Sequence, residues 1–264
     1  MPVVRVDEIS DERLTPFLRV ADAELRRREG VFLAEGRLVV GRLLADAAHG
    51  VRAVLVTDAA LHALRDEIAA RPDVPVYVVP LAWMEPLTGF NLNRGCLAVA
   101  ARPAAREWKS ITGKRLLILE GIGNPDNVGG LFRTAHALGT DGLLLGPGTG
   151  DPFYRKALRV SCGATLAVPF ASTDSVAAAV DYLRGNGFAV WALTPSPGAA
   201  PLEEACRAVP DRLALLVGAE GPGLSSEVLA RASRQVRVPV RPDADSLNVT
   251  VAAGIVLAAT AVRE

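Results

Sequence analysis

A series of short, nearly all-apolar runs in the second half of the chain constrains its fold most strongly. The runs lie at residues 116–120, 142–146, 165–170, 188–193, 213–218 and 236–240. Helical patterns separate them, and a closing helix is expected to start near Asp245. Strands that are apolar on both faces and alternate with helices are typical of a parallel sheet covered on both sides. We therefore predict an α/β fold with a buried parallel sheet.

The first part of the chain shows the same alternation on a smaller scale. Apolar runs predict strands at 31–34, 53–56, 76–79 and 97–100, and periodic segments predict helices at 11–28, 37–49 and 59–70. This pattern indicates a small α/β domain. The polar stretch 102–113, which contains Pro103 and Gly113, is typical of a linker. We expect two domains, residues 1–104 and 105–264.

Composition and spacing narrow the classes of function. The chain has three cysteines and three histidines without CxxC or HExxH spacing, so no metal site is expected. The apolar stretch 247–262 carries Asn248 and Thr250, which favours a buried helix over a membrane span. The N-terminus lacks an apolar signal core, which indicates a cytoplasmic protein. A formal net charge of zero leaves nucleic-acid binding open.

Ligands of open parallel sheets bind beyond the carboxyl ends of the strands, so the loops that leave the strands are candidates for a site. The first loop, residues 120–135, leads into a helix expected to start near Asn127, with Asp126 or Asn127 as its cap. Arg133 follows six residues after Asn127, a spacing that could bring both side chains near the mouth of this helix. Helix capping and a solvated arginine explain the two residues equally well. Asp126 also stands where a dinucleotide-binding GxGxxG motif needs glycine, which argues against an oxidoreductase.

The second loop, residues 216–225, contains three glycines and one acid, Glu220. Glycines let the backbone approach a ligand closely, so this turn could hold an adenosine through its amides and carbonyls. By itself, the loop is better explained as a tight strand-to-helix turn with Ser225 or Ser226 as the N-cap.

The third loop, residues 243–253, is expected to start a helix of small apolar residues capped by Asp245 or Ser246. Asn248 would then lie in the first helical turn, as a polar side chain at the edge of an apolar helix. The alternative explanation is capping, with Ala252, Ala253 and Gly254 serving only close helix packing.

In this order and at these spacings, the three loops resemble the three motifs of the SpoU/TrmH branch of the SPOUT RNA methyltransferases. The matching stretches are NPDNVGGLFRTAHALG, LLVGAEGPGLS and DSLNVTVAAGIVLAAT, and RKALRVSCGATLAVPF between them is also similar to its counterpart. The stretch FLAEGRLVV and, more loosely, GCLAVAA resemble the substrate-binding domain that often precedes this catalytic domain.

The resemblance implies a doubly wound parallel sheet with a trefoil knot, preceded by a small RNA-binding domain of ribosomal-protein type. It also implies a homodimer that uses S-adenosylmethionine to methylate a ribose 2′-hydroxyl of structured rRNA or tRNA. The catalytic positions of the family correspond to Arg133, Asn127, Glu220, Ser246 and Asn248, with the central role at Arg133. The positions that border the cofactor correspond to Gly218, Ala219, Glu220, Gly221, Leu247, Asn248 and Val249.

The resemblance leaves the role of Arg133 open. An arginine acting as the proton acceptor would need a strongly lowered pKa, whereas arginine is essentially always protonated in proteins. We therefore favour a cationic guanidinium that binds an RNA phosphate and the developing alkoxide.

The residues expected to contact RNA are Arg26, Arg27, Arg28 and Arg37 in the first block and Arg155, Lys156 and Arg159 in the second. A solvated helix face explains the run 26–28 equally well. An RNA-binding or ribosome-assembly factor without methyl transfer is the alternative function. Binding of S-adenosylmethionine would distinguish the two.

Overall fold

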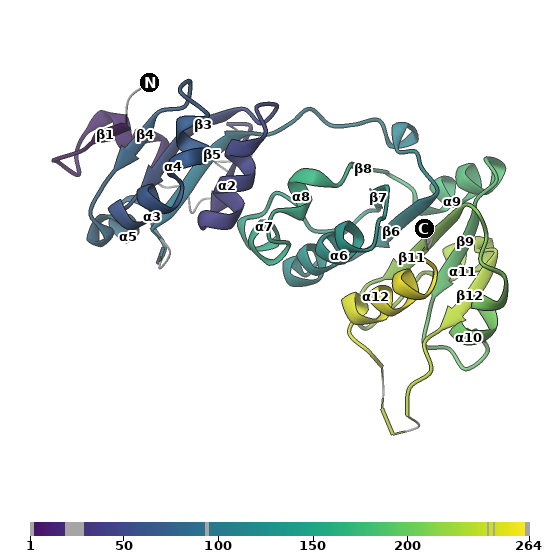
Figure 1. The fold of residues 1–264 in the computed structure, drawn as a ribbon. Helices are drawn as coiled ribbons and strands as arrows, with labels where there is room; N and C mark the ends of the chain where they lie inside the picture. Colours follow the sequence, from purple (N-terminus) through teal and green to yellow (C-terminus); the bar gives the residue numbers. More distant parts are fainter. Residues whose placement is uncertain (1–2, 19–28, 93–94, 242, 245, 262–264) are drawn as a thin grey trace. The chain divides into compact units, whose positions relative to one another are not determined.

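The computed structural model describes the whole chain except residues 1–2, 19–28, 93–94, 242, 245 and 262–264. Its backbone divides into two compact units, each with its own sheet (Figure 1). The first unit comprises Met1–Ala104 together with Phe153–Gly163, and the second comprises Ala105–Pro152 and Ala164–Glu264.

The first unit is built on a mixed sheet. Its described strands follow the order β1-β4-β3-β5-β2, in which β1, β4 and β3 are parallel and β5 is antiparallel to β3 and β2. The strands are β1 (Val3–Arg5), β2 (Val31–Glu35), β3 (Val51–Val56), β4 (Val76–Val78) and β5 (Cys96–Ala101). Four of them lie where apolar runs predicted strands, and the predicted small α/β fold is confirmed. The short strand β1 has no such run and was missed.

Short helices accompany this sheet. The elements are η1 (Glu12–Phe17), α2 (Arg37–Ala45), α3 (Asp58–Ala63), α4 (Arg65–Ala69), η2 (Leu81–Trp83), α5 (Met84–Thr88) and α7 (Arg155–Val160). The helix predicted at 59–70 is interrupted at Leu64, whose ψ of 16° departs from helical geometry.

The helix predicted at 11–28 is wrong over its first part. Residues 12–17 form a 3-10 helix, which ends at Leu18 with an extended ψ of 138°. Pro16 lies inside this element and supplies no backbone N–H, so a regular α-helix would lose a hydrogen bond there. Residues 19–28 lie outside the described part of the chain.

The segment around α7 packs against β2, although the sequence placed it in the second block. The rings of Phe153 and Phe32 lie 4.8 Å apart between centroids. Glu35, the last residue of β2, is 5% exposed and forms ion pairs with Arg155 and Arg159 of α7. A buried carboxylate needs such partners, because an uncompensated charge is costly away from water. This pairing therefore holds α7 in the first unit.

The second unit is a parallel sheet, as predicted. Its described strands follow the order β10-β12-β9-β11-β6-β7-β8, and each pairing between neighbours is parallel. The strands are β6 (Arg115–Glu120), β7 (Gly142–Leu145), β8 (Phe170–Ser172), β9 (Ala189–Leu193), β10 (Ala200–Pro201), β11 (Leu213–Gly218) and β12 (Arg234–Arg237). The predicted doubly wound α/β fold is confirmed, whereas the trefoil knot stays a prediction.

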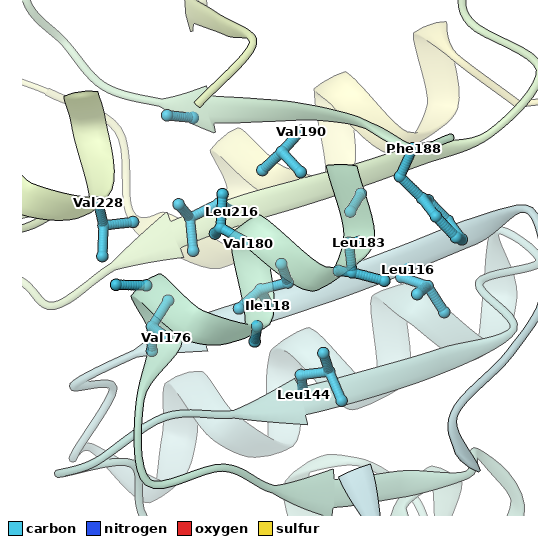
Figure 2. Packing of buried hydrophobic residues seen from close by; sticks show 14 of the residues in the cluster. Leu116, Ile118, Leu144, Val176, Val180, Leu183, Phe188, Val190, Leu216 and Val228 are labelled. Carbon is cyan, nitrogen blue, oxygen red and sulfur yellow. The ribbon is translucent and has the colours of Figure 1, made fainter. Parts of the chain in front are cut away.

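Helices cover both faces of this sheet. They are α6 (Pro125–Ala137), α8 (Ala164–Ala167), α9 (Val176–Gly185), α10 (Leu202–Ala205), α11 (Ser226–Arg231) and α12 (Val249–Ala259), with the 3-10 turns η3 (Trp108–Ser110) and η4 (Cys206–Ala208). Side chains such as Ile118 and Leu216 point to α9 and α11, where they form a buried cluster with Val180 (Figure 2). The helices α6 and α12 lie on the opposite face. Since both faces are covered, the residues on both sides of each strand are buried, and the strand sequences are continuously apolar.

Two predicted strands of this unit are shifted or partly wrong. The run 165–170 begins as the helix α8 and becomes the strand β8 only at Phe170, because a short apolar run does not distinguish a buried helix from a strand. The run 236–240 overlaps only the end of β12, which stops at Arg237, two residues before Pro239. Proline has no backbone N–H to donate to a neighbouring strand, so strand pairing does not continue through Pro239.

The helices α6 and α12 pack closely, with their N-termini at the same end. Gly130 of α6 faces Thr250, and Thr134 faces Gly254, so both contacts advance by four residues along each helix. A Cβ atom at Gly130 would lie 2.9 Å from both the Cγ2 and the Oγ1 of Thr250. The absence of a side chain at Gly130 therefore sets how near the two helices approach.

Two further observations bear on the functional class. Among the helices described, none combines the length and apolar composition needed to cross a membrane. The described residues also hold no group of three His, Cys, Asp or Glu side chains that could bind a metal ion.

Candidate active site

The start of α6 differs from the prediction. Asn124 is the N-cap, with its side chain accepting a hydrogen bond of 2.9 Å from the backbone N–H of Asp126. Pro125 fills the first helical position, where its missing N–H costs nothing, so the cap is one residue earlier than proline. Asn127 is therefore not the cap. It lies in the first turn, 5% exposed, with a side chain available for other contacts.

The start of α12 also differs from the prediction. Asn248 itself is the N-cap, and its Oδ1 accepts a hydrogen bond of 2.9 Å from the backbone N–H of Thr250. Ser246 does not cap the helix, and Asp245, the other predicted cap, lies outside the described residues. Capping fixes the orientation of the Asn248 amide, because its oxygen must face the helix and its nitrogen must point away.

The Asn248 amide nitrogen joins the three loops singled out in the sequence. It donates one hydrogen bond to Oδ1 of Asn127 at 2.9 Å and another to Oε1 of Glu220 at 3.1 Å. Both N–H groups of the amide are thereby used. We call this arrangement of Asn127, Glu220 and Asn248 the Asn248 junction. Residues more than a hundred positions apart in sequence meet here because α6, β11 and α12 end or begin at the same edge of the sheet.

The second loop forms a tight turn, residues 218–225, which we call the glycine turn. The backbone N–H of Gly223 donates to the carbonyl of Ala219 at 3.0 Å, closing the turn on itself. A Cβ atom at Gly218 would lie 2.4 Å from the carbonyl carbon of Gly223, so only glycine fits there. Ser225 caps α11 by accepting from the backbone N–H of Val228 at 3.4 Å.

A cavity of about 650 Å³ opens beside the glycine turn and the start of α12. All the residues predicted to border a cofactor line it, and so does one further predicted site residue. These residues are Gly218, Ala219, Glu220, Gly221, Leu247, Asn248, Val249 and Ser246. The volume lies in the range of cavities that hold small-molecule ligands.

Sequence reasoning missed part of this cavity. Leu193 at the end of β9 lines it, as do Thr194 and Pro195, which follow this strand. Arg237 at the end of β12 and Arg241 beyond it line it too. The rule that ligands bind beyond the carboxyl ends of strands applies to the loop after β9 too, and would have found Thr194 and Pro195. Arg237 could not be anticipated, because the predicted strand 236–240 placed it inside the strand, whereas it is the last residue of β12.

The structure does not bring Arg133 into the lining of this cavity. Its side chain is exposed on α6, about 9 Å along the helix axis and about 120° around it from Asn127. With the residues the structure describes, the Arg133 guanidinium makes no hydrogen bond or ion pair. It is therefore accessible to an anionic ligand.

The predicted RNA contacts have different surroundings. Arg37 is exposed at the start of α2, and Lys156 is half-buried on α7. Arg155 and Arg159 are engaged with the buried carboxylate of Glu35. The remaining candidates, Arg26, Arg27 and Arg28, lie outside the described residues.

Comparisons with known proteins agree with these features. Residues 114–258 match the model of the SpoU rRNA Methylase family. The chain is 40% identical over 262 residues to an uncharacterized tRNA/rRNA methyltransferase of Mycobacterium tuberculosis, which covers 97% of this chain and 90% of the relative. It is 27% identical over 253 residues to the 23S rRNA (guanosine(2553)-2′-O)-methyltransferase RlmP of Bacillus subtilis, with 96% of this chain and 97% of the relative covered.

A solved structure is similar over almost the whole chain. It is a proposed RNA methyltransferase of the TrmH family from Porphyromonas gingivalis, with a TM-score of 0.81 and 26% identity over 97% of this chain and 99% of the other. The resemblance read from the three sequence motifs is thus confirmed, and the chain belongs to the SpoU rRNA methylase family.

Proposed function

We propose that this protein transfers the methyl group of S-adenosylmethionine to a ribose 2′-hydroxyl of an rRNA or tRNA. The observation that carries the proposal is the Asn248 junction, which joins the three motif loops at the edge of the cavity of about 650 Å³. A relative that spans nearly the whole chain, RlmP, is named as a ribose 2′-O-methyltransferase acting on 23S rRNA.

The cavity suits an adenosine-type cofactor. Its wall along Gly218, Ala219 and Gly221 is mostly backbone, which offers amides and carbonyls to a purine. Leu193 and Leu247 add apolar surface on which an aromatic ring can lie. S-adenosylmethionine, when bound, supplies a methyl group that is already activated for transfer. Glu220, Leu247, Asn248 and Val249 complete the predicted cofactor contacts.

The residues of the Asn248 junction position their neighbours rather than exchange protons. Asn248 donates to Asn127 and to one carboxylate oxygen of Glu220, which leaves the Asn127 amide nitrogen and the other Glu220 oxygen for a ligand. Such neutral and acidic groups can orient a ribose hydroxyl in line with the methyl group, and correct orientation lowers a barrier by as much as ~7–11 kcal/mol. Ser246, exposed at the cavity wall, would assist the same placement.

Arg133 would supply the positive charge. Its exposed guanidinium can bind the phosphate beside the reacting nucleotide and stabilise the charge that develops on the ribose oxygen. Replacing Arg133 with alanine should reduce turnover by about 100-fold or more, since removal of one such stabilising donor typically costs that much. Arg133→Lys keeps the charge but loses the planar pair of donors. Its turnover should therefore lie between those of the natural chain and Arg133→Ala. Full activity in Arg133→Ala would exclude this role.

The active form would be a homodimer in which a second copy covers α12. Val251 and Ile255 are 50% and 39% exposed on this helix, an unusual amount of apolar surface beside a ligand cavity. Sedimentation velocity should show a dimer for the natural chain and a monomer for Ile255→Glu. Leu81→Glu, at an apolar residue that is 58% exposed in the first unit, should remain dimeric. A natural chain that sediments as a monomer at micromolar concentration would contradict the dimer.

The first unit would select the RNA. Arg37, which is exposed, and Lys156 are candidates for phosphate contacts. Arg155 and Arg159, the other candidates in this unit that the structure describes, form ion pairs with Glu35. A cytoplasmic location is part of the same proposal, because rRNA and tRNA occur there.

Two measurements test the function. Calorimetry should detect saturable binding of S-adenosylmethionine, and incubation with labelled cofactor and total RNA from a strain lacking the protein should label one nucleotide at its 2′-oxygen. Binding without transfer to any RNA, or no binding at all, would favour an RNA-binding or assembly factor instead.

A further inference from the structure

Glu120, the last residue of β6, makes contacts that the sequence motifs do not account for. Its carboxylate accepts two hydrogen bonds from Ser225, one from the backbone N–H to Oε2 at 2.9 Å and one from the hydroxyl to Oε1 at 2.8 Å. Both carboxylate oxygens are thus bound to a single residue of a different loop. Hydrogen bonds to an ionised acceptor are about twice as strong as neutral ones, so this contact is a strong one.

The contact lies at a particular place on the glycine turn. The turn starts at Gly218, which is the register partner of Glu120 in the sheet, and it ends at Ser225, which the Glu120 side chain binds. One residue therefore holds both ends of the turn, through its backbone position and through its carboxylate.

Contacts within the turn are few by comparison. Gly223 donates to Ala219, while Gly221 and Gly223 have positive φ angles of 86° and 70°. Glycine in such conformations is highly flexible in the absence of outside contacts. Glu220 is bound from outside by Asn248, and Ser225 by Glu120, so two contacts to other elements stabilise the shape of the cavity wall.

Ser225 transmits the contact to α11 as well. Its hydroxyl donates to Glu120 and accepts from the backbone N–H of Val228 at the start of this helix. Because the hydroxyl proton is directed to the carboxylate, its lone pairs are left to face Val228.

We propose that Glu120 is a positioning residue for the cofactor: it pre-forms the glycine turn before S-adenosylmethionine binds. This inference rests on the proposed function. A site that is correctly shaped in only a fraction of molecules binds its ligand more weakly by that fraction. Loss of the Glu120 carboxylate should therefore weaken cofactor binding, whereas saturating cofactor should restore the turn and most of the turnover.

A matched control exists at the other end of β6. The carboxylate of Asp141 also accepts from two backbone N–H groups, those of Lys114 and Arg115, at 2.7 Å and 2.8 Å. It contacts the start of this strand and does not line the cavity. Both N–H groups bind the same oxygen, Oδ2, so Asp141→Asn removes the charge from a similar contact in the same unit, as Glu120→Gln does, without touching the glycine turn.

The experiment measures the Kd of S-adenosylmethionine by calorimetry for the natural chain, Glu120→Ala, Glu120→Gln and Asp141→Asn. We expect the Kd to rise about tenfold in Glu120→Ala, the scale of one lost charge-assisted hydrogen bond, and about threefold in Glu120→Gln, which keeps one acceptor. Asp141→Asn should bind within about twofold of the natural chain, by the same scale. At saturating cofactor, kcat of the Glu120 variants should stay within about threefold, because bound cofactor reorders the turn.

Hydrogen exchange of the cofactor-free protein gives a second readout. Amides of residues 219–221 and 223–225 should exchange faster in both Glu120 variants than in the natural chain, whereas their exchange should be unchanged in Asp141→Asn. If Glu120→Ala does not fold, the Kd and the exchange rates of Glu120→Gln alone test the proposal. Equal Kd and equal exchange in the Glu120 variants would overturn the inference, as would an equal loss of affinity in Asp141→Asn. Failure of the natural chain to bind cofactor would instead reject the proposed function.

Discussion

Asn248 performs two tasks with one side chain. Its oxygen caps α12, and its nitrogen joins Asn127 and Glu220 beside the cavity. The first task belongs to folding and the second to the proposed chemistry. Since the two use different atoms of the amide, a substitution can separate them.

Asn248→Asp keeps a capping oxygen but replaces the donor nitrogen with a second oxygen. Aspartate caps a helix as well as asparagine does, so the loss of stability should come only from the two hydrogen bonds that the amide nitrogen donates, about 1–3 kcal/mol. The new carboxylate would face Glu220, a like charge, and kcat/KM should fall at least about tenfold. Urea unfolding and steady-state assays measure the two effects.

Asn124→Asp is the matched control, because Asn124 makes the equivalent cap on α6. Its activity should stay near that of the natural chain. If Asn248→Asp also remained active, the Asn248 junction would have no role in the reaction.

Cys96 is an ionisable residue that the proposed chemistry does not use. It is fully buried at the start of β5, and burial raises the pKa of its thiol to about 12, against a smaller opposite effect of the charge on Arg37. The folded protein therefore keeps this thiol neutral over a pH range in which the unfolded chain ionises it.

The raised pKa of Cys96 predicts a pH dependence of stability. Above about pH 9, where an exposed thiol ionises, unfolding releases a proton from Cys96, so the free energy of unfolding falls as pH rises toward about 12. The Cys96→Ala variant has no thiol at this position, so its unfolding does not release this proton. The stability difference between the natural chain and the variant, measured by urea unfolding, should be constant at pH 6–8 and should shrink above about pH 9. A constant difference up to pH 10.5 would show that the pKa is not raised.

At the level of elements, the pair α6 and α12 brings Asn127 and Asn248 together. Gly130 and Gly254 each leave room for a threonine of the other helix. The distance between the two asparagines therefore depends on residues that touch neither of them.

Gly130→Ala tests this packing. Alanine favours a helix by about 1 kcal/mol over glycine, but its Cβ would meet Thr250 at 2.9 Å and force the helices apart. Overpacking typically costs about 1–3 kcal/mol, so we expect a net loss of stability and a loss of activity. Adding Thr250→Ala should relieve the contact and restore both, as a double-mutant cycle would show. Independent, additive effects of the two substitutions would contradict close packing here.

At the level of the whole molecule, the two compact units have separate cores, one around Phe17 and Leu33 and the other around Ile118 and Leu216. The cavity is lined by residues of the second unit. A ligand bound there should stabilise that unit through mass action, without a direct effect on the first core.

Calorimetric unfolding of the full chain tests this division. S-adenosylmethionine at about 100 times its Kd should stabilise the second unit by about 2.7 kcal/mol and raise its transition temperature. The transition of the first unit should move less. An equal rise of the transition temperature for both units would indicate that they unfold together. An unchanged transition temperature for both would argue against cofactor binding.

The sequence was informative where a signal is local. Runs such as 213–218 are apolar on both faces because the sheet is covered on both faces, and they marked strands within a residue or two. Local signals failed where the same short pattern of residues is compatible with two different local structures. The run 165–170 changes from helix to strand, and the caps at Asn124 and Asn248 were displaced from the predicted positions by Pro125 and by the late start of α12.

The sequence by itself determined the alternation of strands and helices, the glycine turn and the three motifs, because propensity, apolar pattern and backbone freedom act over neighbouring residues. Only the tertiary structure decided that the Asn248 amide binds Asn127 and Glu220, that Glu120 binds Ser225, and that Glu35 engages two predicted RNA-binding arginines. Each of these contacts joins positions far apart in the chain. Which distant side chains meet depends on strand order and helix packing, which no local stretch of residues encodes.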